Sequence, residues 1–125
     1  MVKEIHTENA PAAIGPYSQA IKAGDFIYVS GQIGVDPTNG EVVDGIESQT
    51  QQVLKNIQAI LTEAGTDFSK VVKFTIYLAS MNDFGIVNEI YGSYLNKPYP
   101  ARATVEVSRL PKDVLVEIDA VVYDK

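Results

Sequence analysis

The sequence predicts an α+β fold in which two helices cover one face of a largely antiparallel or mixed sheet. Strand-like segments occur at both ends of the chain, two amphipathic helical patterns lie between them, and one apolar strand pattern separates those helices. The predicted order is β-β-β-α-β-α-β-β. With 125 residues, 46% of them apolar and 21% charged, the chain has the composition of one globular domain spanning residues 1–125.

The N-terminal strand signals end in a tight hairpin. Residues 18–23 and 26–33 are rich in strand formers, and Gly24-Asp25 between them suits a type II′ turn. A peripheral first strand is expected around His6. Residues 36–40 then collect turn-forming side chains and predict a sharp reversal of the chain.

The clearest helical pattern runs from about residue 48 to residue 64. Ser48 and Gln51 have the spacing of a capping box, and Gly65 suits the left-handed position after the last turn. Apolar residues recur at helical spacing and predict a buried face, formed by Val53, Leu54, Ile57, Ile60, Leu61 and Ala64. The opposite side of the helix is expected to carry Gln52, Lys55, Asn56 and Glu63.

A strand and a second helix follow. Residues 71–79 are rich in β-branched and aromatic side chains, which predicts a strand. The second helix is expected over about residues 83–95, with Asn82 as its cap. Apolar residues cover about half of its circumference, and Asn88 lies on the flank of that arc as a polar group near buried surface.

The chain is expected to end in a hairpin of strands 101–108 and 114–123, joined by a turn at residues 110–113. Alternation gives one apolar face, which should carry the helices: Ala101, Ala103, Val105, Val107, Val116, Ile118, Ala120 and Val122. The other face is mixed: Arg102, Thr104, Glu106, Ser108, Leu115, Glu117, Asp119 and Val121. An uncovered, half-apolar face predicts that several chains associate through it.

Arg102 is the most informative charged residue of this mixed face. It is one of two arginines in the chain, and the other, Arg109, lies at the turn. A guanidinium in mid-strand offers a planar set of donors to a carboxylate. From the residues alone two interpretations stay open: Arg102 binds the carboxylate of a ligand, or it forms a structural ion pair with Glu117 or Glu106.

Charge and composition oppose several classes of function. Ten basic against sixteen acidic residues give a net charge of −6, without a basic run that would favour nucleic acid or an anionic membrane. The sequence has no cysteine, no signal peptide and no apolar run of membrane-spanning length, so a cytoplasmic location is expected. His6 is the only histidine, and Asp36, Asp44 and Glu47 lack the companions of a metal cluster.

Four blocks of the sequence resemble the RidA (YjgF) family of reactive-intermediate deaminases. The longest consists of residues 100–107 (PARATVEV) followed by residues 109–118 (RLPKDVLVEI). Residues 14–20 (IGPYSQA) and 29–34 (VSGQIG) resemble two N-terminal blocks of the family, and residues 84–91 (FGIVNEIY) resemble its second-helix block. The blocks occur in the family's order and span nearly the whole chain.

The resemblance implies a chorismate-mutase-like fold and a homotrimer with ligand clefts between subunits. The implied activity is hydrolysis of 2-imino acids and their enamine tautomers, such as 2-iminobutanoate and 2-iminopropanoate, to 2-oxo acids and ammonia. Such imines arise when pyridoxal-phosphate enzymes dehydrate serine or threonine. The deaminase itself would need neither a cofactor nor a metal.

The resemblance also implies three catalytic residues. Arg102 would clamp the substrate carboxylate, which orients the imine carbon. Glu117 would hold and polarise the attacking water or carry a proton to the leaving nitrogen, and Tyr17 would close the site with its hydroxyl. Burial would raise the pKa of Glu117 and a neighbouring Arg102 would lower it, so the sequence leaves the net direction open.

Three further residues would bind the substrate. Gly31 would let the ligand approach the backbone closely, although alone it also suggests a β-bulge. Asn88 would line the cleft from its helix. Thr104 stands where many members of the family carry cysteine, so only its hydroxyl or backbone could contribute.

Two other classes of function stay open. A non-catalytic regulatory protein that binds small 2-oxo acids could use Arg102 in the same way. The Glu117→Gln variant distinguishes the two, because only in an enzyme would it abolish turnover and still bind the ligand. The family has also been assigned as an endoribonuclease or translation inhibitor. The net charge and the missing basic stripe oppose that assignment.

Overall fold

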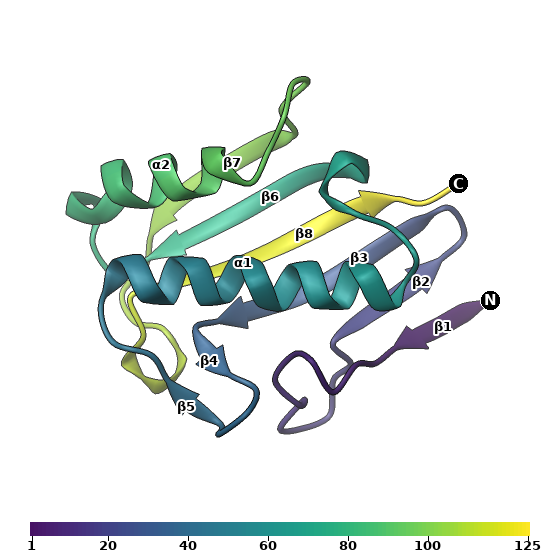
Figure 1. Ribbon diagram of the computed structural model, residues 1–125, viewed down its shortest axis with the longest axis horizontal. Coiled ribbons are helices and arrows are strands. Elements are labelled where there is room, and N and C mark those ends of the chain that lie inside the picture. Colours follow the sequence, from purple (N-terminus) through teal and green to yellow (C-terminus); the bar gives the residue numbers. More distant parts are fainter.

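The computed structural model describes residues 1–125, and two α-helices lie on one side of a six-stranded sheet (Figure 1). The helices are α1 (Ile46–Glu63) and α2 (Phe84–Ser93). The strands are β1 (Val2–Ile5), β2 (Ala20–Ala23), β3 (Phe26–Ile33), β4 (Val35–Asp36), β5 (Glu41–Val42), β6 (Val71–Leu78), β7 (Ala101–Glu106) and β8 (Val116–Tyr123). Strands β4 and β5 form a separate two-stranded ribbon. The predicted α+β class with a mixed sheet is confirmed.

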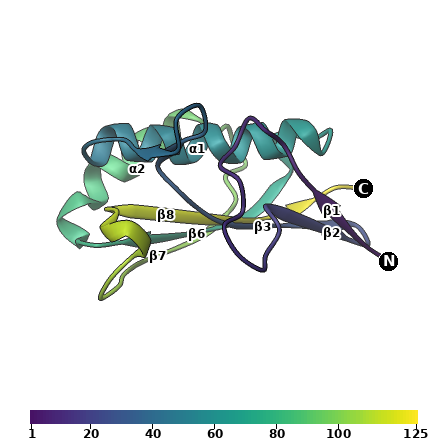
Figure 2. The same ribbon diagram turned by 90° about the horizontal axis from the view of Figure 1, so that it is seen from below.

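The sheet has the strand order β1-β2-β3-β8-β6-β7, and every pair is antiparallel except β6 and β7. The predicted N-terminal hairpin is present, because Ala23 pairs with Phe26 across a two-residue loop and Gly24 has a φ of 61°. The turn expected at residues 36–40 connects β4 to β5. Edge-on, the sheet carries both helices on one side and none on the other (Figure 2).

The predicted C-terminal hairpin is wrong. β8 pairs with β3 and β6, whereas β7 pairs with β6 in parallel and forms the edge of the sheet. The chain leaves β6, passes through α2 and returns as β7, which is the kind of crossover that parallel neighbours need. Alternation in a sequence gives the period of a strand but does not identify its partner.

The faces of β7 are also the reverse of the prediction. Arg102 lies beside Phe74 of β6, and Thr104 lies beside Ile76. Phe74 and Ile76 are fully buried in the core beneath the helices, so Arg102, Thr104 and Glu106 share the helix side. Ala101, Ala103 and Val105 share the uncovered side. For β8 the prediction holds, because its residues Val116, Ile118, Ala120 and Val122 are buried.

Helix α1 packs its apolar face on the sheet as predicted. Five of its side chains are fully buried, and each stabilises the fold by roughly 1.5–3 kcal/mol: Val53, Leu54, Ile57, Ile60 and Leu61. Gly65 has the expected positive φ of 80°. The predicted capping box is wrong, because the N-cap is Gly45 and no side chain caps this end. Asn56 is also not on the outer side: it is 1% exposed.

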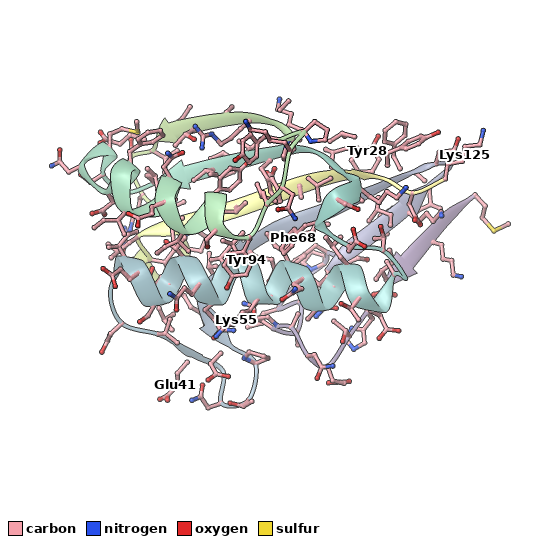
Figure 3. All side chains as sticks on the ribbon, turned by 45° about the horizontal axis from the view of Figure 1, so that its top comes forward. Tyr28, Glu41, Lys55, Phe68, Tyr94 and Lys125 are labelled. Carbon is pink, nitrogen blue, oxygen red and sulfur yellow. The ribbon has the colours of Figure 1, made fainter.

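Helix α2 is shorter than predicted and begins after a 3-10 turn at Met81–Asp83. Ser80, rather than Asn82, caps that turn, since its hydroxyl accepts a hydrogen bond from the Asn82 amide at 3.1 Å. Phe68 and Tyr94 meet edge to face at 5.9 Å and fill the space between the two helices (Figure 3). This contact joins the end of α2, the helix that carries Asn88, to the segment that precedes β6.

The uncovered side of the sheet carries large exposed apolar side chains. Tyr28 is 51% exposed and Val105 is 44% exposed. The half-apolar character of this face is therefore as predicted, although β7 contributes different residues to it. No helix in the structure is both long and apolar enough to cross a bilayer.

Candidate functional site

The larger cavity of the molecule, of about 800 Å³, opens where β3 approaches the ribbon of β4 and β5. Its lining includes three of the predicted site residues, Tyr17, Gly31 and Glu117. Ile33 and Lys112 also line it. We call this the Glu117 half-site.

Gly31 lies in a β-bulge, where the register between β3 and β8 shifts between Val29 and Gln32. A Cβ atom on Gly31 would come within 2.9 Å of Cδ of Glu117 and overlap its carboxylate. The absence of a side chain therefore lets the Glu117 carboxylate lie directly against the backbone of the bulge. The β-bulge interpretation of Gly31 is confirmed, and the close approach in the structure is that of the Glu117 side chain.

Burial raises the pKa of Glu117 above its ordinary value, and the negative charge of Asp119 raises it further. Asp119 is itself held in place, because its carboxylate accepts a hydrogen bond of 2.9 Å from the Tyr77 hydroxyl. The lowering influence expected from Arg102 is missing, since Arg102 lies on the opposite face of the sheet. A carboxyl group with a raised pKa keeps its proton to a higher pH than an ordinary glutamate does, which suits proton transfer.

A smaller cavity of about 450 Å³ lies between α2 and β7. Its lining includes Asn88, Tyr91, Tyr99 and Arg102. Nη1 of Arg102 donates to Oδ1 of Asn88 at 2.5 Å, and the guanidinium carbon lies 5.1 Å from the centre of the Tyr91 ring. We call this the Arg102 half-site.

Arg102 has no carboxylate partner. The ion pairs of the chain are His6–Glu8, Lys22–Asp124 and Arg109–Asp113. Glu106 instead accepts a hydrogen bond from the backbone amide of Met81 at 2.8 Å. The interpretation of Arg102 as a structural ion pair is therefore wrong within one chain. Its guanidinium is oriented by the Asn88 amide and by the rings of Tyr91 and Phe84, with donors left over.

The structure divides the predicted site into two groups. Tyr17, Gly31 and Glu117 belong to one cavity, and Arg102 and Asn88 belong to the other. The expected proximity of Arg102 and Glu117 is wrong within one chain, because the two face opposite sides of the sheet and β6 separates their strands.

Thr104 is the one predicted site residue that lines neither cavity. It lies on the helix side of β7, and its hydroxyl is buried without a hydrogen-bond partner.

Two residues at these cavities escaped the sequence reasoning. Tyr91 is 5% exposed, its ring packs beneath the Arg102 guanidinium, and its hydroxyl has no hydrogen-bond partner. Its position three residues after Asn88 on one helix is the signal that could have identified it. Lys112 lines the larger cavity with a φ of 55°, and its place in the predicted turn and in the block at residues 109–118 is the signal that could have identified it.

No three histidine, aspartate or glutamate side chains gather closely enough to hold a metal ion. His6 contacts only Glu8, at 3.3 Å, and lines neither half-site; it lies just after β1. The chemistry available at the two cavities is thus a guanidinium, the ammonium group of Lys112, a carboxyl group with a raised pKa, and hydroxyl and amide groups.

Comparison with known proteins gives consistent matches over the whole chain. A family model described as Endoribonuclease L-PSP matches residues 7–124. A RutC family protein of Pyrococcus horikoshii is 58% identical over 124 residues, which are 98% of each chain. The 2-iminobutanoate/2-iminopropanoate deaminase of Mus musculus is 52% identical over 120 residues, covering 95% of this chain and 89% of the mouse protein.

Solved structures show the same fold. RidA from an Antarctic Psychrobacter has a TM-score of 0.94 at 46% identity, over 97% of this chain and 98% of that one. E. coli TdcF, solved with bound serine, has a TM-score of 0.94 at 39% identity, over 98% of this chain and 99% of that one.

Proposed function

The chain belongs to the RidA (YjgF) family, and from this premise we propose that it is a hydrolytic deaminase of 2-imino acids and their enamine tautomers. The observation that carries the proposal is the state of Arg102. Its guanidinium is oriented by Asn88 and Tyr91 and has no acidic partner, which is what a binding group for a substrate carboxylate requires.

The two half-sites act together when copies of the chain associate. Because Arg102 and Glu117 lie on opposite faces of the sheet and on strands separated by β6, a three- or four-carbon imino acid cannot touch both in one chain. A head-to-tail ring brings the Arg102 half-site of one copy to the Glu117 half-site of the next. The resemblance to the family gives three as the number of copies, and the exposed Tyr28 and Val105 supply apolar surface for the contact.

In this cleft Arg102 holds the substrate carboxylate and so places the imine carbon. Glu117, as a carboxylate against the backbone of Gly31, holds a water molecule and accepts a proton as the water oxygen adds to that carbon. The same carboxyl group then returns the proton to the nitrogen. The addition product is a carbinolamine. Glu117 then moves the proton of its new hydroxyl group to the amino nitrogen, the carbon–nitrogen bond breaks, ammonia leaves, and the carbonyl group of the 2-oxo acid forms. Tyr17 lines the cavity beside the reacting atoms, and no redox step is needed.

The first test measures imine hydrolysis. An amino-acid oxidase or threonine dehydratase generates the imine, semicarbazide traps what remains, and wild type is compared with Arg102→Ala. We expect wild type to reduce the trappable imine and Arg102→Ala to match the blank. Arg109→Ala is the matched control, because it removes the only other arginine, which is 78% exposed and pairs with Asp113.

A complementation test examines the shared cleft. Arg102→Ala and Glu117→Gln are each expected to be inactive, but in an equal, randomly assembled mixture about one quarter of the clefts combine both native side chains. Recovery of about a quarter of the wild-type activity supports the shared cleft. No recovery, in an assembly shown by mass to contain both variants, contradicts it.

The other two functions are outcomes of the same experiments. If wild type leaves the imine untouched but binds 2-oxo acids through Arg102, the protein is a ligand sensor. Ribonuclease activity that survives removal of both Arg102 and Glu117 after stringent repurification would support the activity named in the family description. The net charge of −6 opposes binding to a polyanion.

A further inference from the structure

The core contains a carboxamide whose hydrogen bonds reach the strand that carries Gly31. Asn56 of α1 is 1% exposed and lines neither cavity. Its Nδ2 donates to the carbonyl oxygen of Ile33 at 3.2 Å and to that of Val35 at 3.0 Å. Its Oδ1 accepts a hydrogen bond of 2.8 Å from Nε2 of Gln52, one turn earlier on the helix. The carboxamide is therefore held at both ends.

The two carbonyl groups belong to a break in the sheet. Ile33 is the last residue of β3 and Val35 is the first of β4, so the chain leaves the six-stranded sheet between them. Both carbonyls accept a hydrogen bond from Asn56, and a buried carbonyl without a partner would be costly. One side chain from α1 satisfies both, which explains why a polar residue lies in the core.

The helix contacts this break closely at a second point. A Cβ atom on Gly34 would lie 2.9 Å from Cα of Gln49, so the backbone of the break rests directly on α1. The Gln49 side chain, 6% exposed, accepts a hydrogen bond of 2.8 Å from the amide of Leu115, just before β8. Two carboxamides, two helical turns apart, thus hold the end of β3 and the start of β8.

These two strand ends carry the reacting part of the Glu117 half-site. Ile33 is the register partner of Glu117, and Gly31 lies two residues before Ile33. Gly31, Ile33, Val35 and Glu117 all line the same cavity. A shift of the Ile33 carbonyl therefore changes the separation between the Gly31 backbone and the Glu117 carboxylate.

We propose that Asn56 is a positioning residue for the reaction, which through the Ile33 and Val35 carbonyls fixes the Gly31 bulge against the Glu117 carboxylate and so places the attacking water. Gln49 holds the other strand in the same way. This inference rests on the proposed deaminase function. It assigns no contact between Asn56 and the substrate, and no residue of α1 lines the Arg102 half-site.

The test compares steady-state imine hydrolysis by wild type, Asn56→Leu and Gln52→Ala. Asn56→Leu keeps the approximate volume and removes the hydrogen bonds to both carbonyls. We expect kcat to fall by about tenfold to a hundredfold, with KM within about twofold, because water is misplaced while Arg102 still binds the carboxylate. Gln52→Ala removes only the bond that orients the carboxamide, and a fall in kcat of about threefold is expected.

Ile60→Ala is the control for a merely structural role. Ile60 is fully buried one turn further along α1, and its truncation lowers the melting temperature without touching either strand break. Below its melting temperature Ile60→Ala is expected to keep the wild-type kcat and KM. A structural role for Asn56 would give the same result in Asn56→Leu.

The outcomes separate the two proposals. If wild type has no activity, the deaminase function fails. If wild type is active and Asn56→Leu and Gln52→Ala both fold and keep the wild-type kcat, the positioning role is overturned. The positioning role is also overturned if kcat falls in Ile60→Ala as much as in Asn56→Leu. A rise in the KM of Asn56→Leu with an unchanged kcat would overturn it as well. Should Asn56→Leu not fold, Gln52→Ala decides alone, because Gln52 is partly exposed and its replacement removes a single hydrogen bond.

Discussion

The two half-sites differ in almost every physical respect although Arg102 and Glu117 are close in the sequence. The Arg102 half-site is smaller, lies on the helix side of an edge strand, and presents an exposed guanidinium held by Asn88 and Tyr91. The Glu117 half-site is larger, lies on the uncovered side of a central strand, and holds a carboxyl group with a raised pKa against a bulge.

The difference suits the two half-sites to different tasks, substrate binding at the Arg102 half-site and proton transfer at the Glu117 half-site. An exposed, permanently charged donor suits recognition of a carboxylate, because it keeps its charge and geometry whatever the pH. A partly desolvated carboxyl group suits proton transfer, because its pKa has been moved towards the working pH. Changes at one half-site should therefore affect binding, and changes at the other should affect turnover.

Glu117→Gln gives the largest expected effect. Loss of the proton-carrying group lowers kcat by roughly 10²- to 10⁴-fold, while a 2-oxo acid product still binds. Turnover at the wild-type rate in this variant would exclude Glu117 from the chemistry. Glu41→Gln, at an exposed carboxylate on the β4–β5 ribbon, is the control.

The same variant should be more stable than wild type at neutral pH. The raised pKa of Glu117 means that the folded chain binds more protons than the unfolded chain between the ordinary glutamate value and the raised value. The stability of wild type therefore falls as the pH rises through that window, and the neutral amide of the variant does not titrate, so this loss disappears. We expect a higher melting temperature at pH 7 and an equal one below about pH 4.

Gly31→Ala is expected to lower kcat by about a hundredfold, because the methyl group occupies the place of the Glu117 carboxylate. The displaced group is the end of a flexible side chain, so the melting temperature should change little. Gly85→Ala on α2 is the matched control, since a Cβ there meets nothing within 4 Å. Normal kinetics in Gly31→Ala would show that the close approach has no catalytic purpose.

Arg102→Lys should act mainly on binding. An ammonium group cannot copy the planar set of donors, so KM is expected to rise about tenfold while the fold is retained. An unchanged KM in this variant would show that the Arg102 guanidinium does not bind the substrate carboxylate. A loss confined to kcat would contradict the division between the two half-sites.

Asp119→Asn gives the smallest expected effect. The substitution removes the negative charge of Asp119, which helps to raise the pKa of Glu117. The amide oxygen of the new asparagine can still accept the hydrogen bond from the Tyr77 hydroxyl. The acid limb of the kcat profile should move to lower pH by less than about one unit. Asp113→Asn, at the surface pair with Arg109, should not move it.

Local patterns predicted much of the fold. The strand at residues 26–33, the two-residue loop at Gly24-Asp25 and the buried face of α1 follow from alternation, turn chemistry and helical periodicity. The pairing of β7 did not, because Ala101, Ala103 and Val105 have the pattern of a core face whether they meet helices or another chain. Only the partner strand decides which side they occupy.

The geometry of the candidate site could not be predicted from the sequence. The resemblance brought together Gly31, Asn88, Arg102 and Glu117, yet one chain holds them in two places. Asn56 was missed because an amide in a helix is usually exposed. Its partners are backbone carbonyls more than twenty residues away in the sequence. Because every residue has a backbone carbonyl, no residue type in the sequence marks such a partner.

Because β6 and the thickness of the sheet separate Arg102 from Glu117, the activity of each chain should depend on the concentration of the protein. If each cleft takes one half from each of two chains, the number of working clefts follows the law of mass action. Activity per chain then declines on dilution even while every chain stays folded. Under the proposed function, the clearance of reactive imines would then change more than proportionally with the amount of protein that a cell makes.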